Sequence, residues 1–345
     1  SFNLTLLNTV SSLILAMFLA DLFRSSGIAN KMVVSLESLS PKLAAFSVPA
    51  IIGLLPMPAG AYISATIIDP LYTNCKLDSE DKTFLNYWFR HIWVTVWPLY
   101  QGVILASAIL DMGFSEIIYY NWPIFVGALA SGLIKSMPIM LTRSNCTKRE
   151  GHGGYSGLLY LWPFIVIAIL VMVTRIPLPL SLITTIVLFI AIHKPSRYAI
   201  KNGLRYSVDP TITMLIIESL IFSKVIERSG LSNQLAQYLY QYADIAVFAI
   251  PFLMVIATGF EFTFVTLAFP SILPLLKGYR ITLAFLGGFT GAMLSPSHAC
   301  FVLSAKYFKT SLGSVYIKHL IHSIVLTIAI TLSITAVSYT HLRAH

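Results

Sequence analysis

An apolar stretch of the chain is interrupted by the sequence Gly53-Leu54-Leu55-Pro56-Met57-Pro58-Ala59-Gly60. Two prolines break any helix that reaches this point, and the glycine permits a tight turn. The surrounding apolar residues run from 43 to 72. This leaves two arms of about 13 residues, whereas a bilayer span needs about 20, so the stretch predicts a re-entrant hairpin.

A second apolar stretch, residues 245–276, is broken at Ala257-Thr258-Gly259-Phe260-Glu261-Phe262-Thr263. Its arms are also too short to span a bilayer, and it predicts a second re-entrant hairpin. This break carries the one charge between Asp244 and Lys277, the carboxylate of Glu261. An ionisable group at membrane depth is a functional hypothesis by default.

The composition of the whole chain agrees with a membrane location. Of its 345 residues, 57% are hydrophobic and 11% are charged, against roughly 25% charged in ordinary soluble domains. This excludes a disordered chain and almost any soluble enzyme. We therefore expect an all-α, polytopic membrane protein in a lipid bilayer. The apolar runs predict eight spans: 3–23, 86–110, 117–141, 157–174, 176–193, 210–226, 281–305 and 318–336.

The net charge of +9 comes from basic residues in short loops. This is the positive-inside bias of membrane proteins, and we expect no nucleic-acid partner. The loops 142–156 and 194–209 are both basic and are separated by two spans, so both are predicted to be cytoplasmic, with 111–116 external. A re-entrant 245–276 also places Lys306, Lys309 and Lys318 inside.

Two parts of the chain repeat the same order of features. Arg24-Ser25-Ser26-Gly27-Ile28-Ala29-Asn30 resembles Glu227-Arg228-Ser229-Gly230-Leu231-Ser232-Asn233, and each precedes a hairpin. Each hairpin is followed by a span that a proline interrupts, Pro98 or Pro296. The two units, 1–141 and 157–336, would have opposite orientation, an arrangement typical of secondary transporters. We expect the first to lack N-terminal helices and 337–345 to be an artefactual tail.

The hairpin tips and the interrupted spans should meet near the midplane of the membrane. Half-helix N-termini there suit an anion, and half-helix C-termini suit Na⁺. The expected substrate is therefore a small anion. The candidate binding residues are Pro56, Pro58, Gly60, Arg90, His91, Thr258, Gly259, Ser295, Ser297 and His298. The alternatives are structural: a kink at the prolines, an interfacial anchor at Arg90 and His91, and repair of the broken backbone at Ser295–His298.

Glu261 is the candidate coupling residue. A buried carboxyl that exchanges protons would couple transport to H⁺, and His298 would be able to share that role. Alternatively, Glu261 binds Na⁺ or only caps a half-helix. We expect no cofactor other than a coupling H⁺ or Na⁺. Because Cys75, Cys146 and Cys300 are scattered, they predict neither a disulfide nor a metal site.

Several motifs resemble an uncharacterised prokaryotic family of integral membrane proteins, domain of unknown function 401. They are Gly53–Pro58, Tyr87–Trp93 with Trp97–Tyr100, and Ser295–His298 with Lys306–Phe308. That family is similar to the ion transporter superfamily, which includes gluconate, citrate and dicarboxylate permeases. The resemblance implies a homodimer in a prokaryotic inner membrane that moves small organic anions with H⁺ or Na⁺ by an elevator motion.

Two other functions stay open from the sequence. An anion channel or a non-transport membrane subunit would not need inverted hairpins. Gly154-Tyr155-Ser156-Gly157 matches the nucleophile pattern of intramembrane serine proteases, with His319 or His322 as a base. Ser156 is predicted to lie in a polar loop rather than in a cavity, so we expect no enzyme.

Overall fold

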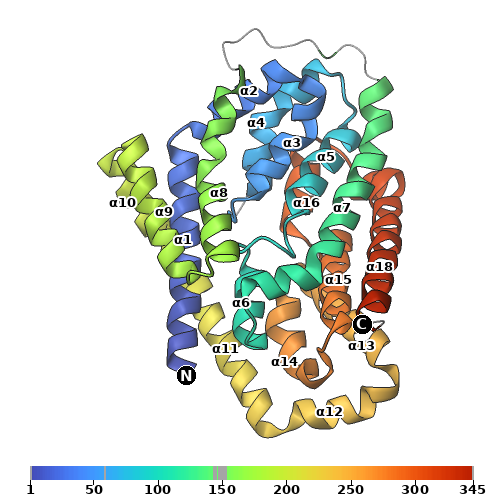
Figure 1. Ribbon diagram of the computed structural model, residues 1–345. Helices are drawn as coiled ribbons and strands as arrows, with labels where there is room; N and C mark the ends of the chain where they lie inside the picture. The colour runs from blue at the N-terminus through green and yellow to red at the C-terminus, as the bar shows by residue number, and fades with distance from the viewer. Residues whose placement is uncertain (1, 58–59, 143–145, 147–153, 344–345) are drawn as a thin grey trace.

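The computed structural model describes residues 2–57, 60–142, 146 and 154–343, and every regular element in these ranges is a helix (Figure 1). The first half contains α1 (Phe2–Ser25), α2 (Ile28–Leu39), α3 (Pro41–Gly53), α4 (Gly60–Asn74), α5 (Ser79–His91), α6 (Gln101–Leu110) and α7 (Phe114–Thr142). The second half contains η1 (Gly154–Leu161), α8 (Trp162–Ala168), η2 (Ile169–Val173), α9 (Leu178–His193), α10 (Arg197–Ser207), α11 (Pro210–Ser229), α12 (Leu231–Leu239), η3 (Tyr240–Tyr242), α13 (Ala243–Thr258), η4 (Phe264–Ala268), α14 (Phe269–Ile272), η5 (Leu273–Leu275), α15 (Tyr279–Leu294), α16 (Ala299–Tyr307), α17 (Leu312–Val315), η6 (Tyr316–Leu320) and α18 (Ile321–Arg343).

Four helical segments are long and apolar enough to cross a membrane: Asn3–Ser25, Phe114–Leu141, Leu231–Thr258 and Leu312–Ser338. The prediction of an all-α protein with membrane-spanning helices is confirmed in this form. The segment Leu231–Thr258 reaches its length by joining α12, η3 and α13. Figure 1 shows α12 lying across the lower end of the molecule while α13 leaves that end.

The expected span 86–110 is two helices with irregular backbone between them. Helix α5 begins at Ser79, earlier than predicted, and ends at His91, and α6 begins at Gln101. The intervening backbone is fixed by tertiary contacts, because the indoles of Trp93 and Trp97 donate to the carbonyls of Ala50 and Leu54. Likewise, the expected span 281–305 is α15 and α16 with a break at residues 295–298.

The two interrupted apolar stretches form separate helical arms. Helices α3 and α4 flank the first break, and α13 and the segment η4–α14–η5 flank the second. In Figure 1, α3 and α4 lie in the upper half of the molecule, whereas α13 and α14 lie in the lower half. Helices α3, α4 and α13 are 13, 15 and 16 residues long, against the predicted arms of about 13 residues.

Helices α7 and α18 pack against each other in antiparallel orientation. The Ser131 and Thr327 hydroxyls are 2.7 Å apart, and the Thr331 hydroxyl donates to the carbonyl of Pro123 at 3.4 Å. The residue numbers of the α18 partners thus decrease from 331 to 327 as those on α7 increase from 123 to 131. The end of α7 and the start of α18 therefore lie at the same end of the molecule.

The prediction that the cysteines form no disulfide is wrong. Cys75 and Cys146 are bonded across a sequence separation of 71 residues. Spacing did not reveal this pair, because only the folded chain brings the end of α4 to the segment after α7. Residues 143–145 and 147–153 of the predicted cytoplasmic loop 142–156 lie outside the described residues.

Candidate functional site

Helix α5 lies in the core and positions the two basic candidates at its last turn. Its aromatic residues Phe84, Tyr87, Trp88 and Phe89 have no exposed surface. The Tyr87 hydroxyl donates to the carbonyl of Ala292 at 3.0 Å. The same helix therefore contacts α15, and its orientation relative to the second half of the chain is fixed by buried hydrogen bonds.

A second polar residue of α5 reaches the first hairpin. The amide nitrogen of Asn86 donates to the carbonyl of Ala61 at 3.0 Å and to the hydroxyl of Ser304 at 2.9 Å. Asn86 is fully buried. These bonds join α4, α5 and α16 around one point, and the sequence contained no motif that marked Asn86.

Arg90 is 4% exposed, and its Nε and Nη1 atoms have no hydrogen-bond partner in the described part of the chain. The guanidinium packs on Gly60, where an added Cβ would lie 2.5 Å from Nη2. Gly60 begins α4, and the first N–H groups of a helix lack intrahelical partners. A buried cation beside a helix N-terminus is suited to binding an anion. Burial also excludes an interfacial anchor for Arg90.

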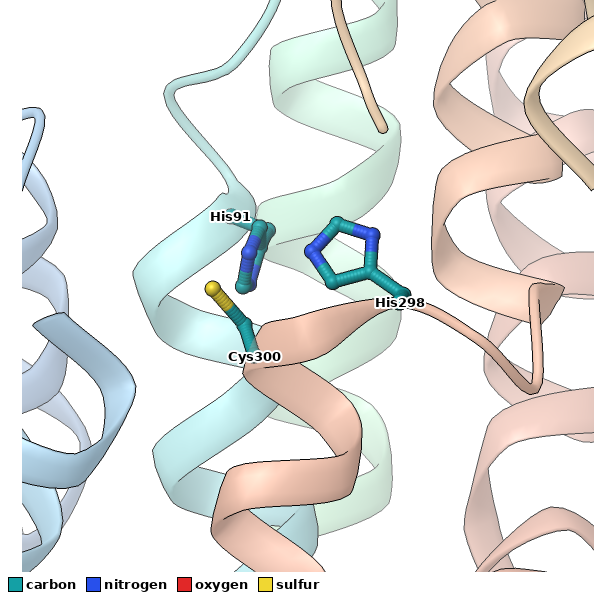
Figure 2. Close-up of side chains that lie close together, drawn as sticks. All are labelled: His91, His298 and Cys300. Atoms are coloured by element: carbon teal, nitrogen blue, oxygen red, sulfur yellow. The ribbon is translucent and has the colours of Figure 1, made fainter. Parts of the chain in front are cut away.

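His91 and His298 come together from the two broken spans. Their ring centroids are 5.1 Å apart, and the side chains are 3% and 4% exposed. Cys300, at the start of α16, completes a cluster in which one donor atom from each residue lies within 4.8 Å of the others (Figure 2). The sequence prediction included both histidines and missed Cys300.

The second hairpin tip lies against the break between α15 and α16. Gly259 has φ +75°, and an added Cβ would lie 2.6 Å from the Ser297 hydroxyl oxygen. Ser295 Oγ donates to the carbonyl of Ile256 at 3.1 Å and lies 3.0 Å from Ser297 Oγ. Ser295 thus links the break to α13 by a hydrogen bond. This fits the alternative that Ser295 stabilises the broken backbone rather than binding a substrate.

These contacts bring Arg90, the two histidines and both hairpin tips around one centre, and the family match covers the segments that form it. A family described as "Protein of unknown function (DUF401)" matches residues 3–340. The chain belongs to this family. No protein of curated function matches it.

Two further candidates of the second tip in this DUF401 protein have different surroundings. Thr258 is half-buried, and its hydroxyl donates to Met254 and lies 2.8 Å from that of Thr263, so it stabilises the tip itself. Glu261 is half-buried, and its charge interacts with that of Arg90. Among the described residues Glu261 makes no ion pair within 4.0 Å.

In the first tip, Pro56 is half-buried and Pro58 lies outside the described residues. The tip is held by Tyr100, which the sequence prediction missed. The Tyr100 hydroxyl is 2.8 Å from the carbonyl oxygen of Gly53 and 3.1 Å from that of Arg90. A tyrosine shortly after the proline break was the available signal.

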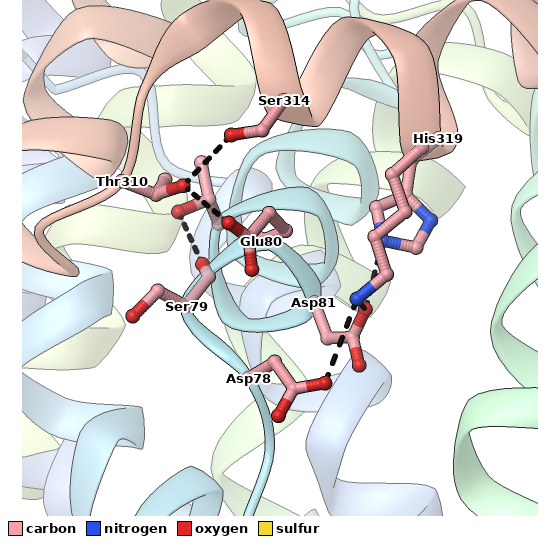
Figure 3. A network of polar contacts seen from close by, with 9 residues as sticks. Asp78, Ser79, Glu80, Asp81, Thr310, Ser314 and His319 are labelled. Carbon is pink, nitrogen blue, oxygen red and sulfur yellow. Dashed lines mark hydrogen bonds and ion pairs between the residues drawn. The ribbon is translucent and has the colours of Figure 1, made fainter.

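A polar network at the N-terminal end of α5 joins this helix to the segment before α18 (Figure 3). Asp81 accepts from Lys318 at 2.7 Å and pairs with His319 Nε2 at 2.8 Å. Burial works to raise the pKa of Asp81, but the hydrogen bonds and charges of His319 and Lys318 outweigh it and lower the pKa. The network anchors the helix that carries Arg90.

Proposed function

We propose that this protein is a secondary active transporter of a small organic anion, coupled to H⁺, that works by alternating access of the elevator type. The observation that carries this proposal is the buried, incompletely paired guanidinium of Arg90 at the start of α4. A buried charge without a full set of partners is costly. An anionic substrate would supply the missing acceptors.

The proposed architecture is an inverted repeat with two re-entrant hairpins. It is supported by the opposite halves that the hairpin arms occupy in Figure 1. It is also supported by local detail: Gly27 and Gly230 start the corresponding helices α2 and α12 with φ of +70° and +73°. Each tip packs beside the break of its own unit, Gly60 on Arg90 in the last turn of α5 and Gly259 on Ser297 in the break after α15.

The orientation of the basic segments supports re-entrant hairpins as well. The antiparallel packing of α7 and α18 puts the start of α18, near Lys318, at the end of the molecule where α7 stops. This is the arrangement that a re-entrant 245–276 requires. The protein is proposed to be a homodimer in a prokaryotic inner membrane, as a relationship of its family to the ion transporter superfamily would imply.

Glu261 is the proposed coupling residue. It lies at a hairpin tip and its charge interacts with the Arg90 side chain. Protonation would remove a negative charge that competes with the substrate anion for Arg90. Substrate and proton would then favour the same state of the site, which is the requirement for symport.

The test is uptake of a panel of labelled organic acids by proteoliposomes that contain the full chain. We expect saturable uptake driven by an inward proton gradient. Glu261→Gln should lose gradient-driven uptake and retain substrate exchange, because the neutral amide imitates the protonated carboxyl. Glu227→Gln, at an exposed pair with Lys224, is the matched control. Ohmic anion current without saturation would instead indicate a channel, and unchanged gradient-driven uptake in Glu261→Gln would place coupling elsewhere.

A further inference from the structure

The cluster of His91, His298 and Cys300 has the features of a metal site. The three residues come from α5, from the break after α15 and from the first turn of α16 (Figure 2). Their donor atoms lie within 4.8 Å of one another. Cys300 is the one free thiol of the chain, because the other two cysteines form the disulfide.

The ring of His91 is held with one nitrogen free. His91 Nδ1 is 2.6 Å from the carbonyl oxygen of Tyr87. A carbonyl can only accept, so in the neutral ring Nδ1 carries the proton and Nε2 keeps its lone pair. Metal-binding histidines are commonly oriented in this way, by a hydrogen bond from the second ring nitrogen to a carbonyl.

The ring of His298 also presents one nitrogen to the cluster. Figure 2 shows its Nε2 pointing toward His91 and Cys300, whereas Nδ1 lies on the far side of the ring. Nδ1 is buried and has no hydrogen-bond partner among the described residues. A neutral imidazole in this orientation can offer the lone pair of Nε2 to a metal ion.

Cys300 would bind a metal ion as a thiolate, and the positive charge of Arg90 acts on its sulfur. The sulfur lies near the backbone of Ala61, in the first turn of α4. Free N–H groups and the positive end of a helix dipole suit the negative sulfur that a bound metal ion would require. A thiolate also offsets part of a metal ion's charge, which the neighbouring Arg90 opposes.

We propose that His91 Nε2, His298 Nε2 and Cys300 Sγ bind one Zn²⁺-type transition-metal ion. Nitrogen and sulfur donors select such ions over Mg²⁺ and Ca²⁺. Zinc bonds of about 2.0–2.3 Å require the cluster to contract by about 1 Å. Three protein ligands leave a fourth tetrahedral position for water or for an anion held at Arg90. The site stands independently of the proposed transport function.

The experiment is a Co²⁺ titration of the purified full chain in detergent, followed by optical absorption. We expect one Co²⁺ per chain, a thiolate-to-Co²⁺ charge-transfer band and the intense visible bands of four-coordinate Co²⁺. Added Zn²⁺ should displace the Co²⁺. Cys300→Ser should lose the charge-transfer band, and His298→Gln should weaken binding by about 10- to 100-fold or more.

The matched control is the double variant Cys75→Ser with Cys146→Ser, which should keep the full spectrum. A charge-transfer band that survives in Cys300→Ser, or a folded wild-type chain that binds no stoichiometric Co²⁺, would overturn the proposal. If a variant fails to fold, a second measurement on the wild-type chain still tests the proposal. Zn²⁺ should slow alkylation of Cys300 in the wild-type chain, and an unchanged rate would also overturn the metal site. Neither readout depends on a transported substrate.

Discussion

Replacing Gly259 by alanine should destabilise the protein more than the same change at Gly230. Both glycines have left-handed backbone, φ +75° and +73°. An alanine at either position costs about 1–2 kcal/mol through its backbone conformation. At Gly230 no heavy atom lies within 4 Å of an added Cβ, whereas at Gly259 the carbonyl carbon and oxygen of Ser297 lie at 2.8 Å.

The backbone of Ser297 cannot move aside without disturbing the break between α15 and α16. Overpacking of this kind adds about 1–3 kcal/mol. The expected loss in the free energy of unfolding is therefore about 1–2 kcal/mol for Gly230→Ala and about 2–5 kcal/mol for Gly259→Ala. The difference between the variants measures the contact between the second tip and the break.

The assay is denaturant unfolding in detergent micelles, with helical circular dichroism as the signal. Intrinsic fluorescence should report the same transition, since the free-energy comparison requires two-state behaviour. Gly27→Ala provides a second control, because its φ is +70° and nothing lies within 4 Å of an added Cβ. Equal losses in all three variants would refute the packing of the second tip against Ser297, and with it the assembly of the proposed site.

Three further predictions concern the anion site, the polar network and the orientation. Arg90→Lys should reduce uptake by about 10- to 100-fold with little change in thermal stability. The reason is that the hydrogen bonds from a planar guanidinium to an anion are worth about 1.5–3 kcal/mol, and a lysine cannot form the same pair of bonds. Unchanged uptake kinetics in proteoliposomes would show that Arg90 does not bind the substrate. The free energy of unfolding should fall below about pH 4 as Asp81 is protonated, since its pKa is lowered from the ordinary 3.8 in the folded state. Asp81→Asn should flatten the plot of unfolding free energy against pH below about pH 4. Asp78 and Glu80 are the other carboxyls that face Lys318. An unaltered plot would contradict the pairing of Asp81 with Lys318 and His319. In a cysteine-free background, an impermeant thiol reagent on intact cells should label Asp111→Cys and not Tyr198→Cys; the reverse pattern would invert the predicted orientation.

The sequence determined the class of protein and the positions of its breaks. Long apolar runs identify membrane helices because each residue's hydropathy is a local property. The prolines near 56 and 296 and the glycines at 60 and 259 locate irregular backbone for the same reason, since φ restrictions act within one or two residues. The basic loops predicted an orientation, which the labelling of Asp111→Cys and Tyr198→Cys would test.

The tertiary structure alone decided which polar residues meet. From the sequence, Arg90 was equally well explained as an anion-binding residue or as an interfacial anchor. Only the packing of α5 in the core shows that it is buried against Gly60. His91 and Cys300 are far apart in the chain, and no spacing rule joins them. Burial and partnership depend on contacts between distant segments, which hydropathy and local turn chemistry do not encode. For this reason the helices and their breaks were predictable, whereas the disulfide, the polar network of α5 and the histidine–cysteine cluster were not.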